Sequence, residues 1–206
     1  MSNICYIHSY CVNHYSSILD YYFSKGKEFF DYCDEIRVLY YDTPPKRYNK
    51  EDHISLTTAD ELETLTHIYK HCQANPNDNI CYIHTKGVTN DVSNECISDW
   101  RNYMFYFCCQ KYKDRIHELS ENDTTGVDLR RDPTLHYSGN FWWAKASYLK
   151  NLCKPEDTLS ALTPRHRAEF WVTSGSGKHF SAHDCGIGVY ERHLHRYPSD
   201  KYESIL

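Results

Sequence analysis

Short apolar runs alternate with amphipathic segments along the N-terminal part of the chain. The run at 3–8 (NICYIH) recurs letter for letter at 79–84, and both copies are almost wholly apolar. A further run, Glu35–Tyr41 (EIRVLYY), is followed by the paired prolines at 44–45, which stop a strand. Continuous apolar runs of this length are typical of strands buried on both faces of a parallel sheet. We therefore predict a strand over each of these segments.

The segments between these strands have helical spacing. Tyr15–Tyr32 carries apolar residues at steps of three and four, with a break at Gly26. Thr58-x-x-Glu61 has the spacing of a capping box. Apolar residues follow it at steps of three and four, so we predict that a helix starts there. A long amphipathic helix is predicted over roughly 93–119, and the polar stretch 46–54 is predicted to be a loop. Strands joined by single helices in this order indicate an α/β fold with a mostly parallel, Rossmann-like sheet flanked by helices.

The pattern is less regular in the second half of the chain. Gly126–Leu129 predicts a short strand, and His136–Ala144 is an aromatic-rich segment. Arg167–Val172 is predicted to be a strand or the end of a helix, and the tail from residue 179 shows little apolar periodicity. We expect one domain over residues 1–206, with the second half forming a ligand-facing subregion of it.

Composition excludes several classes of protein. A length of 206 residues suits one α/β domain, and a net charge of −5 without long Lys/Arg runs counts against a nucleic-acid partner. The first residues do not resemble a signal peptide, and no run of roughly 18 apolar residues occurs, so we expect a soluble, cytoplasmic protein without a membrane span. The ten cysteines form no C-x-x-C pair, which favours reduced, buried thiols over a zinc site or disulfides.

Polar residues follow both copies of the repeated strand. The first copy ends in His8-Ser9-Tyr10 and the second in His84-Thr85-Lys86-Gly87. Ligands of open α/β sheets bind just outside the carboxyl ends of the strands, so these residues are candidates for a site. Lys86 supplies a positive charge, and Gly87 lets backbone N–H groups approach an anion. The sequence predicts a phosphate-bearing ligand here; the alternative is a pair of core strands with incidental polar ends.

Ser138–Trp143 (SGNFWW) is the most unusual stretch of the chain. Neighbouring residues on a strand point to opposite faces, so one tryptophan can pack in the core while the other forms a stacking platform for a sugar or a base. Asn140 beside the pair can hydrogen-bond hydroxyl groups. A purely structural tryptophan pair is the alternative.

Carboxylates and histidines give further candidates. Glu169 lies beside Phe170 and Trp171, and apolar surroundings suit a carboxylate to general-base work; the alternative is an ion pair with a neighbouring arginine. His183 and Asp184 are adjacent and both groups bind metals, although 13 histidines make such pairs common by chance. No P-loop, G-x-G-x-x-G, G-x-S-x-G or H-E-x-x-H motif occurs.

The order of the motifs resembles a known family. YIHTKGV (82–88) precedes DWRNYM (99–104), and HYSGNFWWAKASYL (136–149) precedes RAEFWV (167–172). Over residues 3–185 this order resembles the small GT-A-fold glycosyltransferases found in bacterial surface-polysaccharide clusters and in large DNA viruses. The resemblance implies a nucleotide-sugar-binding half at 1–122 and an acceptor and catalytic half at 123–206.

The resemblance also implies roles for individual residues. Glu169 would be the catalytic base of the sugar transfer, and Lys86 would neutralise the charge of the leaving diphosphate. The nucleotide-sugar donor would be bound by His8, Ser9, Tyr10, His84, Thr85, Lys86, Arg101 and His183. The pocket for the acceptor and the donor sugar would be shaped by Gly139, Asn140, Trp142 and Trp143.

The chain departs from the family at the metal motif. Enzymes of this fold normally hold Mn²⁺ or Mg²⁺ on a D-x-D motif, whereas the corresponding strand end here reads His84-Thr85-Lys86. Lys86 can supply the positive charge itself, helped by Arg101 or His183. Dependence on Mn²⁺ or Mg²⁺ is therefore open, with His183 and Asp184 as the candidate metal ligands.

The sequence thus predicts a glycosyltransferase that moves a sugar from a nucleotide-diphospho-sugar to a hydroxyl of a glycan acceptor, with inversion. The location would be the cytoplasm, of the host if the chain is virus-encoded. One rival is a catalytically inactive sugar- or nucleotide-binding module on the same fold, and another is a nucleic-acid-processing enzyme. The choice of donor and acceptor depends on the loops at 42–57 and 153–166, and the oligomeric state is left open.

Overall fold

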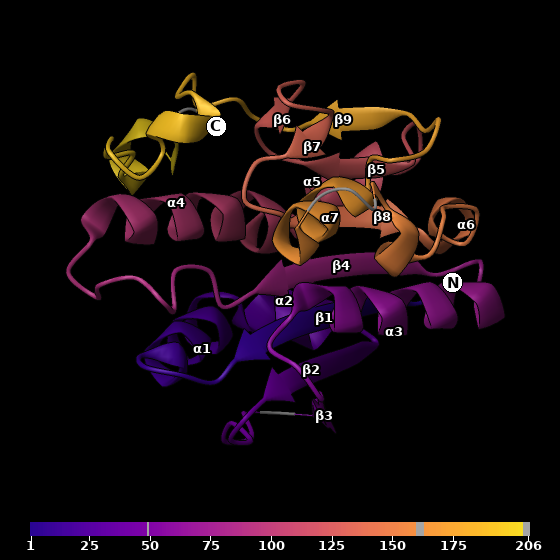
Figure 1. Cartoon of the computed structure of the whole chain (residues 1–206), viewed down its shortest axis with the longest axis horizontal. Coiled ribbons are helices and arrows are strands. Elements are labelled where there is room, and N and C mark those ends of the chain that lie inside the picture. Colours follow the sequence, from indigo (N-terminus) through magenta and orange to yellow (C-terminus); the bar gives the residue numbers. More distant parts are fainter. Residues whose placement is uncertain (49, 160–162, 204–206) are drawn as a thin grey trace.

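The computed structural model describes residues 1–48, 50–159 and 163–203. A seven-stranded sheet runs through the centre, in the order β3-β2-β1-β4-β8-β5-β9, and is flanked by helices (Figure 1). Its strands are β1 (Asn3–Tyr10), β2 (Glu35–Tyr41), β3 (Asp52–Ser55), β4 (Asn79–His84), β5 (Thr124–Gly126), β8 (Trp142–Lys145) and β9 (His179–Ser181). A separate hairpin pairs β6 (Leu129–Arg130) with β7 (His136–Tyr137). The predicted single-domain α/β fold with a mostly parallel, Rossmann-like sheet is confirmed.

The two NICYIH copies are neighbours in the sheet. β1 and β4 pair in parallel and residue for residue, from Asn3 opposite Asn79 to His8 opposite His84. β2 also pairs in parallel with β1, whereas β8 runs antiparallel to both β4 and β5. The three predicted strands are confirmed. The loop predicted at 46–54 is wrong in part, because pairing with β2 draws the polar stretch at 52–55 into an edge strand.

Helices cover both faces of the sheet. The face in front in Figure 1 carries α3 (Glu61–Ala74), α6 (Ala146–Leu149) and α7 (Pro164–Trp171). The other face carries α1 (Tyr15–Lys25), α2 (Lys27–Tyr32), α4 (Glu95–Phe105), a π-helical turn at Tyr106–Gln110, and α5 (Tyr112–Glu118). Among the described residues, no helix is long and apolar enough to cross a membrane.

Several boundaries differ from those that the sequence predicts. The break at Gly26 is confirmed, and a side chain there would lie 2.7 Å from the Phe105 ring. The helix over 93–119 is interrupted by the π-helical turn, whose Cys108 carbonyl accepts a hydrogen bond from the Trp143 indole at 2.7 Å. The segment at 167–172 lies at the end of a helix, as one of the two predictions had it.

The start of α3 lies later than the predicted capping box. Asp60 is the N-cap and accepts a hydrogen bond from the Leu62 N–H at 3.0 Å. Glu63 reaches back and accepts from the backbone N–H groups of Thr57 and Thr58, at 2.9 Å and 3.0 Å. Because Asp60 and Glu63 do the capping, the side chain of Glu61 is available for other contacts.

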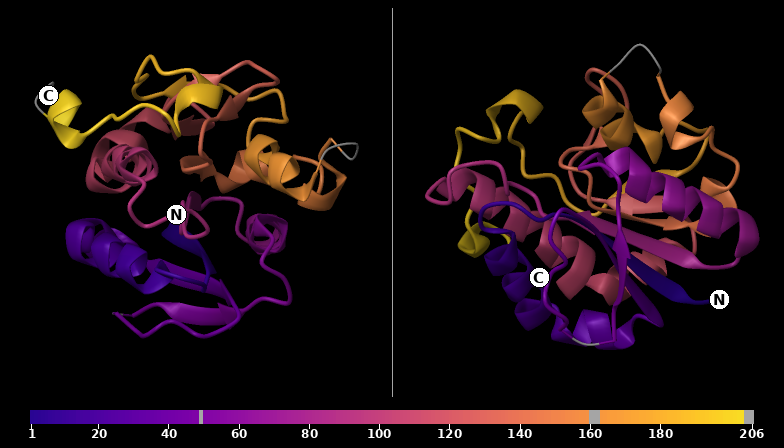
Figure 2. Two further views of the ribbon diagram at one scale, coloured as in Figure 1. Left: turned by 60° about the vertical axis from the view of Figure 1, so that its left-hand side comes forward. Right: turned by 60° about the horizontal axis from the view of Figure 1, so that its bottom comes forward.

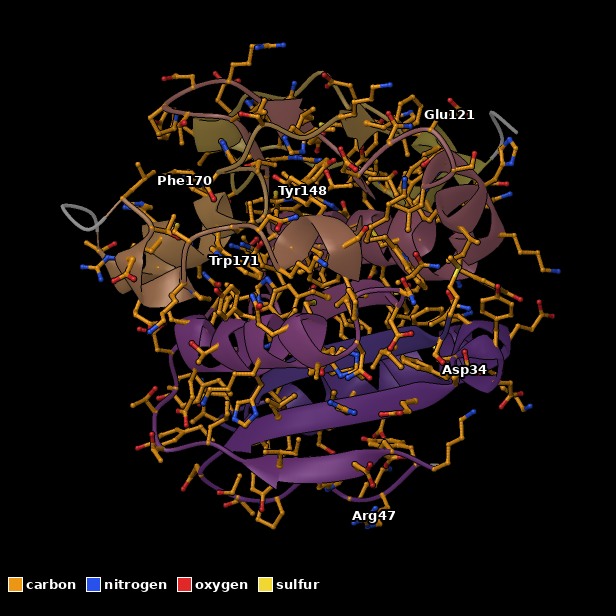
Figure 3. The ribbon with its side chains drawn as sticks, turned by 90° about the vertical axis from the view of Figure 1, so that its right-hand side faces the viewer. Asp34, Arg47, Glu121, Tyr148, Phe170 and Trp171 are labelled. Atoms are coloured by element: carbon orange, nitrogen blue, oxygen red, sulfur yellow. The ribbon has the colours of Figure 1, made fainter. Side chains whose placement is uncertain are left out.

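Both tryptophans of the SGNFWW stretch belong to the core. Trp142 and Trp143 are 0 % exposed and pack on opposite faces of the sheet. Trp142 shares its cluster with Trp171, which lies where the C-terminal half packs over α3 (Figure 3). The predicted stacking platform is therefore wrong, because helices cover both faces of this sheet and leave neither ring open. All ten cysteines are free thiols, as expected, and most of them are buried.

The C-terminal segment lies along α4 (Figure 2). It contains two short 3-10 helices, Val189–Glu191 and Ser199–Lys201. Arg196 pairs with Glu95 and Asp99 of α4, and the buried Arg192 pairs with the buried Asp128. These ion pairs place the segment beside the carboxyl ends of the central strands.

Candidate functional site

A cleft of about 970 Å³ lies at the carboxyl ends of β1 and β4. Its walls are formed by the starts of α3 and α4, by α7, and by Tyr190 and His193 of the C-terminal segment. This volume lies at the upper end of the range typical of small-molecule sites. The predicted site residues that line the cleft are His8, Tyr10, His84, Thr85, Lys86 and Glu169.

The loop after β4 depends on a glycine. Gly87 has a φ of +85°, and a Cβ there would lie 2.4 Å from Ile97 Cγ2 of α4. Thr85 joins the two repeated strands, because its N–H donates to the His8 carbonyl at 3.0 Å. Arg101 donates to the Lys86 carbonyl at 3.3 Å, so the predicted donor-binding arginine supports the backbone of the loop and does not line the cleft.

Lys86 is half-buried beside an aromatic ring. Its ammonium nitrogen lies 4.0 Å from the centre of the Trp100 ring. Burial lowers the pKa of Lys86, while the charges of Glu169 and Glu61 act in the opposite direction. A cation that has lost part of its hydration and faces an open cleft attracts anionic groups of a ligand strongly.

Glu169 is tied to the end of β4 through a turn. The Gly139 N–H donates to Glu169 Oε1 at 3.1 Å, and the Gly139 carbonyl accepts from His84 Nε2 at 3.0 Å. Gly139 has a φ of +91°, and a Cβ there would lie 2.4 Å from Met104 Sδ. Only glycine fits this turn, which holds a carboxylate of α7 in register with the strand end.

Glu61 is a site residue that the sequence did not reveal. Its Oε2 accepts hydrogen bonds from the Tyr82 hydroxyl at 2.7 Å and from Asn140 Nδ2 at 2.9 Å. Burial would raise the pKa of Glu61, but the nearby His84 and His8 and these hydrogen bonds lower it to about 2. The carboxylate is therefore ionised throughout the physiological range. The sequence did not indicate this role, because Glu61 was assigned to a capping box with Thr58.

The two strand-end histidines are neutral at pH 7. Burial lowers the pKa of His8 to about 4, and its Nδ1 lies 2.8 Å from the Thr64 hydroxyl. Burial also lowers the pKa of His84. Ser9 is 0 % exposed and its hydroxyl contacts the Cys11 sulfur at 3.2 Å, so it faces the core and does not line the cleft.

His183 and Asp184 have different hydrogen-bond partners. His183 Nδ1 lies 3.1 Å from the Tyr103 hydroxyl and its ring stacks on Phe107, outside the residues that line the cleft. Asp184 accepts two hydrogen bonds from Arg130, both at 2.7 Å. Each of the two candidate metal ligands is therefore already in contact with another side chain.

Among the described residues, the group of three potential metal ligands is already engaged by arginines. One cluster of ligand atoms, from Asp128, Asp184 and Cys185, lies within 4.8 Å, but guanidinium groups of Arg130 and Arg192 already neutralise its carboxylates. In the cleft, Lys86 lies just beyond the carboxyl end of β4. Like charges repel, so this position disfavours a dication.

Comparison with known proteins gives a family and distant likenesses to solved structures. Residues 21–192 match the family described as "Domain of unknown function (DUF8361)". No curated protein matches the sequence. HddC from Yersinia pseudotuberculosis is similar at 10 % identity and a TM-score of 0.47, over 89 % of this chain and 91 % of that one. A 4-diphosphocytidyl-2C-methyl-D-erythritol synthase is similar at 12 % identity and a TM-score of 0.44, over 99 % and 97 %. Likenesses at these TM-scores carry no argument about chemistry.

Proposed function

The chain belongs to the DUF8361 family, and we propose that it transfers a sugar from a nucleotide-diphospho-sugar donor to a hydroxyl of a glycan acceptor. The observation that supports this proposal best is the joint presence of Lys86 and Glu169 in the cleft of about 970 Å³ at the carboxyl ends of β1 and β4. Such a cleft has room for a nucleotide sugar, and this edge of the sheet is where α/β folds bind their ligands. The order of the sequence motifs, which resembles that of the small GT-A-fold glycosyltransferases, supports the same proposal.

The proposed reaction is a displacement with inversion at the anomeric carbon. The acceptor oxygen bonds to that carbon while the bond to the donor diphosphate breaks, and the electron pair stays on the leaving diphosphate. Glu169 takes the proton of the acceptor hydroxyl as a general base. Lys86 stabilises the negative charge that develops on the diphosphate.

A metal-independent reaction follows from the position of Lys86. The ammonium group lies 4.0 Å from the centre of the Trp100 ring, and Trp100 also lines the cleft. We expect neither Mn²⁺ nor Mg²⁺ to change donor binding, because the fixed cation already neutralises the diphosphate.

Thermal unfolding with a panel of nucleoside diphosphates and nucleotide sugars tests the donor site, with and without Mn²⁺ or Mg²⁺. A ligand that binds the folded state raises Tm according to RT ln(1 + [L]/Kd). We expect one class of nucleotide to raise Tm in the wild type and Lys86→Met to lose most of that rise, a loss of affinity of roughly 10- to 100-fold for one charged contact.

Lys111→Met is the matched control for this experiment. Lys111 also lies over an aromatic ring, 5.6 Å from the centre of Tyr106, but is not among the residues that line the cleft. We expect this variant to keep the full rise in Tm. A wild-type protein that responds to no nucleotide at millimolar concentration would overturn the donor site, and a rise that needs Mn²⁺ would overturn the role of Lys86.

A further inference from the structure

The carboxylate of Glu61 is held by one oxygen and leaves the other open. The Trp142 indole N–H donates to Asn140 Oδ1 at 2.9 Å, which turns the amide nitrogen of Asn140 toward Glu61 Oε2. The Tyr82 hydroxyl donates to the same oxygen. Within the described part of the chain, no N–H or O–H group is hydrogen-bonded to Oε1. The Glu61 side chain is 22 % exposed and lines the cleft, so Oε1 can meet a ligand.

His84 presents a second acceptor beside this oxygen. Its Nε2 lies 3.0 Å from the Gly139 carbonyl, which can only accept, so Nε2 carries a proton. Because burial lowers the pKa of His84, the ring is neutral at pH 7 and Nδ1 carries a lone pair. Nδ1 lies 3.7 Å from Glu61 Oε1, which is beyond hydrogen-bond distance.

Two acceptors so close together require donors from outside the protein. Each partly buried acceptor without a donor costs free energy, and two facing acceptors cannot satisfy each other. A phosphate does not suit the position, since the carboxylate repels it. A hydroxyl group does suit it, and a vicinal diol presents two O–H donors side by side, one for each acceptor.

We propose that Glu61 Oε1 and His84 Nδ1 together bind a vicinal diol of the ligand. This inference rests on the proposed function, since a nucleotide sugar carries such diols on its ribose and on its sugar. Lys86 and the Glu61–His84 pair then divide the ligand between them: the cation holds the diphosphate and the acceptor pair holds hydroxyl groups. Tyr82, Asn140 and Trp142 act as positioning residues for the carboxylate.

Binding by Glu61→Gln tests the inference. The ligands are a nucleoside diphosphate that binds the wild type, its 2′-deoxy analogue and the matching nucleotide sugar. We expect Glu61→Gln to weaken at least one diol-bearing ligand by roughly 10- to 100-fold, the usual loss for a hydrogen bond to a charged group. The exposed Glu28→Gln carries the same chemical change outside the cleft and is expected to bind like the wild type.

The pattern of losses identifies which diol is bound. If the ribose is bound, the nucleoside diphosphate loses affinity in Glu61→Gln, whereas the 2′-deoxy analogue binds both proteins equally weakly. If the donor sugar is bound, both diphosphates bind unchanged and the nucleotide sugar alone loses affinity. Unchanged binding of all three would overturn the inference and leave the donor site intact. If Glu61→Gln does not fold, Tyr82→Phe keeps the ring and removes one of the two hydrogen bonds to Oε2, and a smaller loss in the same pattern is expected.

A ligand-free measurement keeps the inference separate from the proposed function. Two-bond ¹H–¹⁵N spectra of the imidazole rings report the protonation state of His84, and we expect a neutral ring with its proton on Nε2 at pH 7. A doubly protonated ring would overturn the inference, because Nδ1–H would then donate to Glu61. A rise in Tm with Mn²⁺ or Zn²⁺ alone, lost in Glu61→Gln, would overturn it in favour of a metal ligand pair.

Discussion

The ends of β1 and β4 have the same sequence and different chemistry. His8 and His84 are opposite each other in the sheet, at the last positions of the two NICYIH copies. His8 Nδ1 contacts the Thr64 hydroxyl of α3 at 2.8 Å, whereas His84 contacts the carbonyl of Gly139 and faces Glu61. The difference therefore comes from the neighbours of each strand and not from the strand itself.

The position of each strand in the sheet explains its neighbours. β1 lies between β2 and β4, so its end is bordered by other parallel strands. β4 lies beside the antiparallel β8, which brings the turn at 138–140 against His84. Through that turn the end of β4 reaches Glu169 of α7 as well as Glu61 of α3. The catalytic proposal thus depends on β4, while β1 supplies a wall of the cleft.

Removing the charge of Glu169 is the largest expected disruption on the β4 side. If Glu169 is the base, Glu169→Gln lowers turnover by roughly 10²- to 10⁴-fold, the usual contribution of a general base. The amide keeps an oxygen for the Gly139 N–H, so nucleotides are expected to raise Tm as in the wild type. Release of nucleoside diphosphate measures turnover, with Glu28→Gln as the surface control. Unchanged turnover would exclude Glu169 as the base, and binding without turnover in the wild type would favour the inactive binding module.

Adding a side chain at Gly139, which is hydrogen-bonded to both His84 of β4 and Glu169 of α7, is expected to have the next largest effect. Gly139→Ala combines a backbone φ of +91° with a Cβ placed 2.4 Å from Met104 Sδ. Strain and overpacking each cost about 1–3 kcal/mol, so we expect the free energy of unfolding to fall by about 3 kcal/mol.

Gly186→Ala separates strain from crowding in that experiment. Gly186 also has a positive φ, of +75°, but nothing lies within 4 Å of its Cβ position. We expect it to lose about 1 kcal/mol, from backbone strain alone. Chemical denaturation measures both variants. Equal losses would show that crowding against Met104 adds nothing to the backbone strain.

The repeated strands and the fold class were predictable from local sequence. A continuous apolar run indicates a strand buried on both faces, and apolar residues at steps of three and four indicate a helix with one buried face. The sequence also predicted the cleft end of the sheet, since His84 ends a strand whose burial is evident from its composition, and Thr85 and Lys86 follow it. Lys86 was recognisable because a lysine directly after such a strand has no role in the core.

The remaining features depend on contacts between distant segments. Glu61 is free to line the cleft because Asp60 and Glu63 cap α3. Residue spacing alone could not distinguish this cap from a capping box formed by Thr58 and Glu61. Trp142 and Trp143 are buried because helices cover both faces of β8, and the local sequence does not report that coverage. The contact of the Trp100 ring with Lys86 joins α4 to the loop after β4, and helical spacing within α4 does not report it.

Titration of His8, on the β1 side, is expected to have a smaller effect on stability than filling the turn at Gly139. Burial lowers the pKa of His8 from its usual 6.5 to about 4, so the unfolded chain binds its proton more readily than the folded one. The stability that this neutral histidine contributes is complete above pH 6.5 and is lost as the pH falls toward 4. Between pH 7 and pH 5 the loss from His8 alone is about 2 kcal/mol, at 1.36 kcal/mol per pKa unit. Urea denaturation at the two pH values is expected to show this loss in the wild type, and a loss smaller by that amount in His8→Gln. An equal loss in both proteins would mean that His8 is not held neutral in the folded chain.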